Sequence, residues 1–292
     1  MRKHIPVLKT EALFYLKASE GGVFFDGTFG QGGHAEGILK ANVRNIVYSV
    51  DRDPSSEEFA EKLKKNYPER FYFVVCRFSQ AFRVYPLEEC DGFLLDLGIN
   101  QGQLFARGRG FSFFDDLSLD CRINPAEKLI SGEAFLNRAT KKELVDCFKK
   151  GGLGFELPFV VNSILSNRPI KSSKELGDIV LKAIPRKLQV RFKSDPRAVV
   201  LQALRMFINK EVEEIERFLS QLEKKAKNGS RLVIISFHSL EDKLVTATFR
   251  RWAREKLGLL LTKAAIKPSE LEVKTNPSSR SALLRSFEFR AA

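Results

Sequence analysis

The chain has 292 residues, and its 43% hydrophobic content is enough to bury the core of one large domain, or of a core domain that carries a smaller one. No segment reaches the roughly 18 apolar residues that span a bilayer, and the N-terminus lacks the apolar core of a secretion signal. We therefore expect a cytoplasmic protein that does not enter a membrane. Its four cysteines lie far apart without C-x-x-C spacing, so neither a metal site nor a disulfide framework is expected.

Basic residues are concentrated in the second half of the chain. Residues 1–150 contain 22 Lys and Arg against 21 Asp and Glu, whereas residues 151–292 contain 27 against 15. Such an excess favours a polyanionic partner, because neutralising phosphates releases counterions. Nucleic acid is thus a candidate partner, although basic surfaces also occur in proteins that bind none. The sequence leaves open whether the chain is a monomer or a homodimer.

The first hundred residues alternate short apolar runs with helical patterns. The runs at 23–26, 46–51, 71–75 and 92–97 are nearly continuous, which is typical of strands buried on both faces of a parallel sheet. We therefore predict an α/β fold with helices on both faces of the sheet. The second and fourth runs contain acids at or near their ends, Asp51 and Asp96, and in such sheets ligands bind beyond the carboxyl ends of the strands.

Strand patterns stop between about residues 104 and 206. Amphipathic patterns such as those at 141–150 and 174–184 predict helices there. We interpret residues 104–206 as an inserted helical domain, and we assign residues 1–103 and 207–292 to the two parts of the core domain.

The chain then returns to the sheet. One long amphipathic helix is predicted at about 197–227, ended by Asn228-Gly229, and the apolar run at 232–237 resumes the strands. Residues 259–266 and 281–289 supply two last candidate strands.

A glycine-rich turn, FFDGTFGQGGHA at 24–35, follows the first predicted strand. Gly30-x-Gly32-x-x-Ala35 fits the dinucleotide fingerprint, with Asp51 about 20 residues further on to hold a ribose; a turn without a ligand is the alternative. Asp26 favours a cationic cofactor, because a carboxylate repels a pyrophosphate and attracts the ammonium and sulfonium of S-adenosylmethionine (AdoMet). The sequence therefore favours AdoMet over a nicotinamide dinucleotide.

Five further motifs complete a pattern. They are HIPVL at 4–8, DGFLLDLGINQGQL at 91–104, RGFSF at 109–113, ISFHSLED at 235–242 and NPSSRSALLR at 276–285. Together with the glycine turn, these motifs closely resemble, in the same order and over nearly the whole chain, the MraW family of ribosomal RNA small-subunit methyltransferases.

That resemblance implies an AdoMet-dependent enzyme that methylates the exocyclic N4 amine of a cytidine in small-subunit ribosomal RNA, as naked RNA or in the assembled subunit. It also implies a class I, Rossmann-like methyltransferase core interrupted by a helical domain. Asp51 would accept ribose hydroxyls and Phe78 would face adenine; a helix cap and ordinary core packing are the alternatives. The implied cofactor contacts are Gly32, Gly33, His34, Asp51, Phe78, Asp96 and Gln103, and the charge argument adds Asp26.

A cytosine amine is a poor nucleophile because its lone pair is delocalised into the ring. Acceptors that take hydrogen bonds from the amine favour attack on the methyl group. We predict that Asp96 and Asn100 supply these acceptors to a flipped or splayed base, and that the loop at 109–113 covers the base with an aromatic ring.

The RNA contacts expected from these motifs are mostly basic or aromatic. They are Arg109, Phe111, Phe113, Arg186, Lys187, Arg191, His238, Arg280 and Arg285. For His238 the alternative is helix capping by Ser239-x-x-Asp242, and for any single basic residue it is a solvated helix face.

Four segments depart from the family pattern. Val-Ser-Ser is replaced by Ile99-Asn100-Gln101, in which Asn100 can still accept a hydrogen bond, and the other departures lie at 120–123, 153–156 and 196–199. Two other functions stay open. One is a non-catalytic RNA-binding module that kept the cofactor fold, and the other is a dinucleotide-dependent oxidoreductase, which leaves the basic half unexplained.

Overall fold

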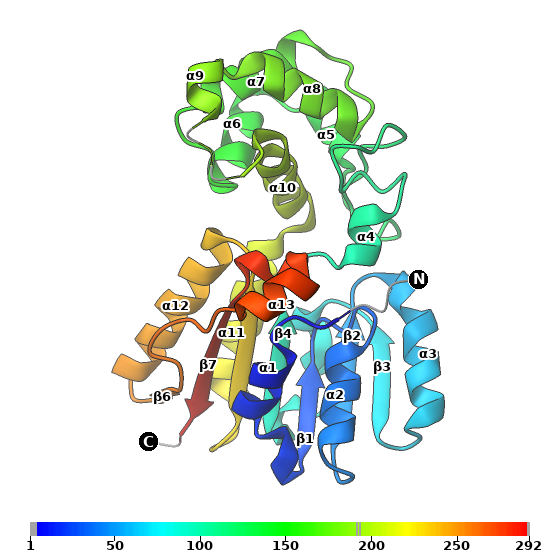
Figure 1. Cartoon of the computed structure of the whole chain (residues 1–292), viewed down its shortest axis with the longest axis vertical. Helices are drawn as coiled ribbons and strands as arrows, with labels where there is room; N and C mark the ends of the chain where they lie inside the picture. Colours follow the sequence, from blue (N-terminus) through cyan, green and yellow to red (C-terminus); the bar gives the residue numbers. More distant parts are fainter. Residues whose placement is uncertain (1–4, 191, 193, 291–292) are drawn as a thin grey trace. The chain divides into compact units, whose positions relative to one another are not determined.

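The computed structural model describes residues 5–190, 192 and 194–290, and the chain divides into two compact units (Figure 1). The sheet unit comprises Met1–Gly98 and Glu213–Ala292, and the insert unit comprises Ile99–Val212. The domain boundaries expected after residues 103 and 206 lie close to these divisions and remain predictions.

The described part of the sheet unit contains one seven-stranded sheet in the order β3-β2-β1-β4-β5-β7-β6 (Figure 1). Strands β1 to β5 are parallel, and β7 runs antiparallel between β5 and β6. The mostly parallel α/β sheet expected from the sequence is thus confirmed. The strands are β1 (Val23–Asp26), β2 (Ile46–Asp51), β3 (Phe71–Val75), β4 (Gly92–Asp96), β5 (Arg231–Ser236), β6 (Gly258–Leu260) and β7 (Leu283–Phe289).

Helices pack on both faces of this sheet. On one face, a core cluster joins α1 (Lys9–Leu16), α2 (Gly33–Ala41) and α3 (Glu57–Asn66) to alternate strand residues such as Phe24 and Val47. On the other face, α11 (Glu211–Lys225) and α12 (Ser239–Arg254) pack against the strand residues of opposite parity. The residues of the central strands are mostly buried by helices on both faces, which explains why their runs read as continuous rather than alternating, whereas Tyr72 and Val74 of the edge strand β3 are exposed.

Shorter elements complete the sheet unit. They are the 3₁₀ segments η1 (Ala18–Glu20), η2 (Pro54–Ser56), η3 (Phe78–Arg83), η4 (Leu87–Glu89) and η5 (Pro277–Ser281), and the helix α13 (Glu270–Thr275).

In the insert unit the regular elements of the described residues are helices. Its core gathers apolar side chains around α10 (Pro196–Asn209), which packs against α5, α6 and α8. The remaining helices are α4 (Gln101–Phe105), α5 (Gly132–Arg138), α6 (Lys141–Lys150), α7 (Leu157–Ser166), α8 (Ser173–Ala183) and α9 (Arg186–Gln189). Across the described residues, no helix combines the length and the apolar character that crossing a bilayer requires.

The long helix expected at 197–227 is wrong: the structure has two helices, α10 and α11. The break lies at Lys210, which caps α10 in the left-handed conformation with φ 55°. Asn209, immediately before it, is fully buried and donates to the carbonyls of Cys121 and Arg205 at 2.7 and 2.8 Å. The bond to Cys121 is a tertiary contact at the point where α10 ends, and periodicity alone predicts continuation there.

Candidate functional site

Three carboxylates lie at the carboxyl ends of three neighbouring strands of the sheet unit. Asp26, Asp51 and Asp96 are the last residues of β1, β2 and β4, and β1 lies between the other two. This is the position at which the strand order reverses direction, where open α/β sheets bind ligands. The sequence placed Asp51 and Asp96 at strand ends, and the sheet order brings Asp26 between them.

The glycine turn that follows β1 is tied to these acids by its backbone. Asp26 Oδ1 accepts from the Thr28 amide at 3.1 Å, and Asp51 Oδ2 accepts from the Gly30 amide at 2.6 Å. The Asp96 amide donates to the Thr28 hydroxyl at 2.6 Å. Gly30 and Gly32 have φ of 55° and 79°, a conformation that glycine adopts without strain. The turn is therefore held in a defined shape, and its backbone is open to close approach.

Burial changes the acidity of two of these carboxyls. Burial raises the pKa of Asp26 from 3.8 to about 7; nearby His34 lowers it, and the charges of Asp96 and Asp51 raise it further. Burial raises the pKa of Asp51 to about 6, while hydrogen bonds from the amides of Asp53 and Gly30 oppose the shift. Buried carboxyls whose pKa is raised in this way favour a neighbouring cation or hydrogen-bond donor, because either one stabilises the charged form.

Two oxygens of the cluster have no hydrogen-bond partner among the described residues. They are Asp26 Oδ2 and Asp96 Oδ1, both shielded from solvent. His34, in the first turn of α2, lies close to the same acids, with Nε2 3.5 Å from Asp96 Oδ2. Buried polar atoms are normally satisfied, so these oxygens indicate a position for donor groups of a ligand.

The N-terminal segment packs against the glycine turn. A Cβ atom on Gly33 would lie only 2.3 Å from Cγ of Pro6, so Pro6 sits directly on this glycine. Two residues near the C-terminus hold the segment: Glu272 accepts from the Leu8 amide at 2.8 Å, and Asn276 donates to the Ile5 carbonyl at 2.9 Å. These contacts were not predicted; Ile5, Pro6, Leu8 and Asn276 lie in the motifs at 4–8 and 276–285, whereas Glu272 lies before the second motif. His4 lies outside the described residues.

Phe78 begins η3 and lies beside the turn. Its Cβ would be 3.0 Å from a Cβ on Gly27, the residue after Asp26. The ring is half-buried and meets Phe218 edge-on, with centroids 5.6 Å apart. Core packing against Phe218 explains one contact of this ring, and the side chain keeps partial exposure to solvent.

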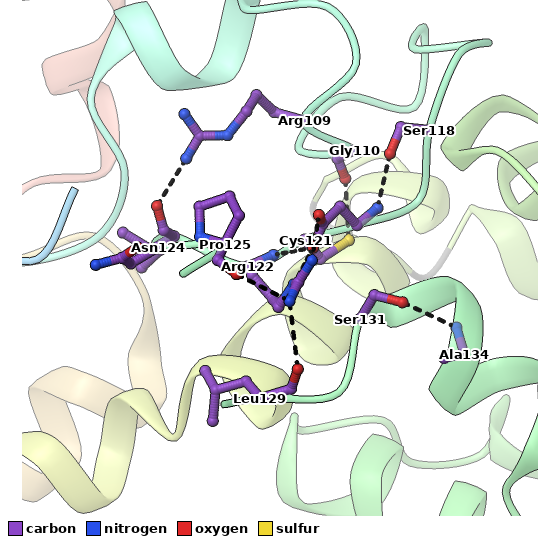
Figure 2. Close-up of polar contacts among 12 residues, drawn as sticks. Arg109, Gly110, Ser118, Cys121, Arg122, Asn124, Pro125, Leu129, Ser131 and Ala134 are labelled. Atoms are coloured by element: carbon purple, nitrogen blue, oxygen red, sulfur yellow. Dashed lines mark hydrogen bonds and ion pairs between the residues drawn. The ribbon is translucent and has the colours of Figure 1, made fainter. Parts of the chain in front are cut away.

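In the insert unit, the loop that carries Arg109 is held by hydrogen bonds from side chains to backbone carbonyls. The Arg109 guanidinium donates to the Ile123 carbonyl at 2.7 Å. Figure 2 shows Arg122 directed at the carbonyls of Pro125 and Leu129. Cys121 Sγ donates to the Gly110 carbonyl at 3.1 Å. Arg109 is thus used in holding the loop.

The aromatic residues of this loop differ in exposure. Phe111 is buried, and Phe113 is half-buried beneath the Arg197 guanidinium, which lies 4.2 Å from the ring centroid. Phe114, which was not predicted as a contact, is 74% exposed and packs against Phe113. The aromatic ring best placed to meet a base is therefore Phe114, and its signal in the sequence was only its position after Phe113.

The other predicted RNA contacts fall into two groups. Arg186 and Lys187 in α9 and Arg280 in η5 are exposed, and Arg191 lies outside the described residues. Arg285 forms a two-pronged ion pair with Asp242, with N–O distances of 2.6 and 3.0 Å. Arg285 therefore has a partner within the sheet unit.

His238 caps α12. Its Nδ1 accepts from the Glu241 amide at 3.4 Å, and its Nε2 lies 2.9 Å from Glu241 Oε1. The expected capping pair of Ser239 and Asp242 is wrong by one residue, because Ser239 is already the first helical residue. Local bonding accounts for His238, and substrate contact at this residue stays a prediction.

Comparison with known proteins identifies the family. The model of the MraW methylase family matches residues 1–290. A ribosomal RNA small subunit methyltransferase H from Nautilia profundicola is 36% identical over 98% of this chain and 97% of its own length. The protein of the same name from Rickettsia akari is 34% identical over 98% of both chains. The chain belongs to the MraW methylase family.

Among solved structures, an rRNA methylase from Streptococcus thermophilus covers 100% of this chain and 99% of its own, with 8% identity and a TM-score of 0.46. The order of the seven strands, with β7 antiparallel between β5 and β6, and the family match agree with the class I methyltransferase core that the resemblance implied.

The MraW cofactor is AdoMet, and the acids of the sheet unit fit it. Asp26 and Asp96 each offer a buried oxygen that has no hydrogen-bond partner in the described part of the chain, and AdoMet carries two positive groups. The charge of the site therefore suits a sulfonium compound better than a diphosphate, as Asp26 predicted.

Asn100, where the MraW pattern has serine, forms a helix cap. Its Oδ1 accepts from the Gln103 amide, and Gln103 Oε1 accepts from the Asn100 amide, both at 2.9 Å. This reciprocal pair starts α4 within the insert unit. Asn and Ser are both good N-caps, so the departure from the family preserves the cap. The catalytic role of Asn100 and the cofactor contact of Gln103 stay predictions.

Proposed function

We propose that this chain transfers a methyl group from AdoMet to the exocyclic N4 amine of a cytidine in small-subunit ribosomal RNA. The observation that carries the proposal is the group of Asp26, Asp51 and Asp96 at neighbouring strand ends, in which Asp26 and Asp96 each have a buried oxygen without a hydrogen-bond partner among the described residues. Membership of the MraW family and the names of the relatives support the choice of RNA as substrate.

Residues of the sheet unit would hold the cofactor. The backbone at Gly32 and Gly33 allows close approach, Asp51 accepts from ribose hydroxyls, and Phe78 offers its free face to adenine. Asp26 attracts the positive charge. When bound, AdoMet supplies an electrophilic methyl group, and no covalent enzyme intermediate is required.

Asp96 is the residue best placed to activate the amine. Its Oδ1 is buried and has no hydrogen-bond partner in the described part of the chain, so it can accept a hydrogen bond from an N–H group of the amine. Accepting from the amine localises the nitrogen lone pair and directs it at the methyl group. Asn100 follows four residues later, and the cap at α4 already occupies one lone pair of its oxygen.

The RNA would bind through charge and stacking. Arg186, Lys187 and Arg280 are exposed and can meet phosphates, which position the RNA without reading its sequence. Phe114 offers an exposed ring to an unpaired base. Since this substrate is part of the ribosome, we infer that the protein works in the cytoplasm, on the assembled small subunit or on its RNA.

The test is to incubate the protein with labelled AdoMet and small ribosomal subunits that lack the modification, and then to map the labelled nucleoside. Naked RNA is tested in parallel to identify the substrate form. We expect N4-methylcytidine at one site with wild-type protein and none with Asp96→Asn. AdoMet binding without transfer would instead favour the RNA-binding module, and tight NAD(H) binding without AdoMet binding would favour the oxidoreductase.

A further inference from the structure

Glu214 is a buried acid that the proposed chemistry does not use. It lies on α11 and is 3% exposed. Its carboxylate accepts from Arg77 Nη1 at 2.7 Å and from the Ser79 hydroxyl at 2.5 Å. Arg77 and Ser79 are the residues immediately before and after Phe78. One carboxylate therefore binds both residues that flank Phe78 in the chain, and the Phe78 ring is the one that would face adenine.

Two more residues of α11 contact the same segment. The ring of Phe218 meets Phe78 edge-on at 5.6 Å, and Gln221 Nε2 donates to the Ser79 carbonyl at 2.8 Å. Glu214, Phe218 and Gln221 are spaced by four and three residues, which places them on one face of the helix. The segment 77–79 is therefore bonded to this face through a charge, a ring and a backbone carbonyl.

The hydrogen bonds to the Glu214 carboxylate depend on the direction of their donors, whereas apolar packing alone does not. A buried carboxylate needs well-placed donors, and Arg77 and Ser79 can satisfy it in one orientation of their backbone. Arg217 lies 3.7 Å from the same carboxylate, but it is 61% exposed and adds little. The requirement to satisfy Glu214 thus restricts the orientation of Phe78 between its two neighbours.

We propose that Glu214 is a positioning residue for the adenine of AdoMet: it acts through Arg77 and Ser79 to hold Phe78 in the orientation that the adenine ring needs. Glu214 itself does not touch the cofactor. This inference rests on the proposed function, since it requires Phe78 to face adenine.

The consequence is a selective loss of affinity for the adenosine part of the cofactor. Glu214→Gln keeps the size of the side chain but removes the charge and places an amide beside Arg77 or Ser79. Hydrogen bonds to charged groups contribute about 1.5–3 kcal/mol, so we expect the Kd of AdoMet to rise about 10-fold or more. At saturating AdoMet, kcat should stay close to the wild-type value, because the acids at the strand ends are unchanged.

A matched control lies on the same helix. The Glu223 carboxylate accepts from Arg251 Nη1 at 2.8 Å and from Trp252 Nε1 at 2.9 Å, so it also links α11 to another segment through an arginine. Its partners Arg251 and Trp252 lie on α12 rather than in the segment 77–79. Glu223→Gln should lower stability without changing AdoMet affinity, whereas Glu214→Gln should change both.

The experiment measures, by calorimetry on the full chain, the Kd values of AdoMet and of 5′-methylthioadenosine, which carries the adenosine without the amino acid. The variants are Glu214→Gln, Phe78→Leu, their combination, and Glu223→Gln. We expect both single variants to weaken both ligands by similar factors, and the double variant to be no weaker than Phe78→Leu, because the two residues act as one unit. KM for AdoMet should rise in Glu214→Gln while kcat does not fall.

Three results would overturn the inference. Glu214→Gln could bind 5′-methylthioadenosine with the wild-type Kd, or the effect of Glu214→Gln on this Kd could add fully to that of Phe78→Leu. The third result is that Glu223→Gln raises the Kd of 5′-methylthioadenosine as much as Glu214→Gln does. If Phe78→Leu itself leaves both affinities unchanged, the result contradicts the proposed placement of adenine against Phe78 rather than the contacts of Glu214. If Glu214→Gln is too unstable to assay, Ser79→Ala removes one of the two bonds and is expected to weaken 5′-methylthioadenosine in the same direction.

Discussion

His34 Nε2 lies 3.5 Å from Asp96 Oδ2, and this contact joins the first turn of α2 to the last residue of β4. Both side chains are largely shielded from solvent, and Asp96 keeps its second oxygen free of hydrogen bonds among the described residues. The histidine thus lies beside one oxygen of the carboxylate, and the other oxygen is left for a ligand or a substrate amine.

Asp96→Asn should therefore remove most of the methyl transfer. The amide keeps the shape of the side chain, but it replaces the accepting charge and can present an NH₂ group to the amine. Loss of one such electrostatic contact lowers kcat by about 100-fold or more. Asp91→Asn is the control, because Asp91 lies before the other end of β4 and accepts from the Val23 amide. A variant Asp96→Asn with wild-type turnover on small subunits would remove Asp96 from the mechanism.

AdoMet binding should depend on pH through Asp26. Because burial raises the pKa of this carboxyl to about 7, raising the pH through neutrality creates a negative charge in the site. AdoMet carries a sulfonium charge that S-adenosylhomocysteine lacks. The preference for AdoMet over S-adenosylhomocysteine should thus increase by up to about tenfold between about pH 6 and 8. Calorimetry at several pH values checks this, and Asp26→Asn should show a smaller change in the ratio, because the Asp51 carboxyl, whose pKa burial raises to about 6, still titrates; a wild-type ratio that does not change with pH would contradict the prediction.

The same carboxyl should make the cofactor-free protein less stable as the pH rises. The unfolded chain releases this proton near its ordinary pKa of 3.8, and the folded protein releases it near 7. Between these values the folded state binds more protons, so the free energy of unfolding falls with rising pH, by at most about 4 kcal/mol for this group. Urea unfolding at about pH 5 and 7.5 should show the fall in wild type. It should be smaller in Asp26→Asn, where the raised pKa of Asp51 still contributes.

Much of the sheet was predictable because each strand is apolar on both sides. The runs at 23–26, 46–51 and 71–75 match β1, β2 and β3, since helices on both faces require continuous apolar residues. The last strands were harder. The run at 259–266 yields β6 only to Leu260, and Ile266 forms an isolated bridge with Leu284 instead.

The acids of the site were visible as strand-end residues, but their supporting contacts were not. The pairs Arg77–Glu214 and Leu8–Glu272 join residues 137 and 264 positions apart, and local patterns carry no information about such pairs. The break at Lys210 was missed for the same reason, because the bond from Asn209 at the end of α10 to the Cys121 carbonyl joins residues 88 positions apart.

Gly33 and Gly37, one turn apart in α2, should respond differently to alanine. A Cβ on Gly33 would lie 2.3 Å from the ring of Pro6, which the N-terminal segment holds in place, so Gly33→Ala must displace that segment or the helix. A Cβ on Gly37 would meet Cε of Lys9 at 2.5 Å, the far end of a side chain that can swing away. Gly33→Ala should weaken AdoMet binding. Gly37→Ala should leave binding unchanged and stabilise the helix by about 0.5–1 kcal/mol.

Calorimetry and urea unfolding on the two variants separate these effects. Equal AdoMet affinity in Gly33→Ala and wild type would show that the packing of Pro6 on the turn does not shape the cofactor site.

Asn100 separates helix capping from catalysis, because serine and alanine substitutions remove different properties. Asn100→Ser keeps an oxygen that can accept from the Gln103 amide, whereas Asn100→Ala removes the cap and should loosen α4 by about 1 kcal/mol. If capping is the role of Asn100, Asn100→Ser should methylate small subunits within about twofold of wild type, and Asn100→Ala should be clearly slower. A serine variant that binds AdoMet normally but loses turnover would show instead that the amide oxygen itself takes part in the reaction. Full activity in Asn100→Ala would exclude both roles, since neither the cap nor the acceptor would then be needed for methyl transfer.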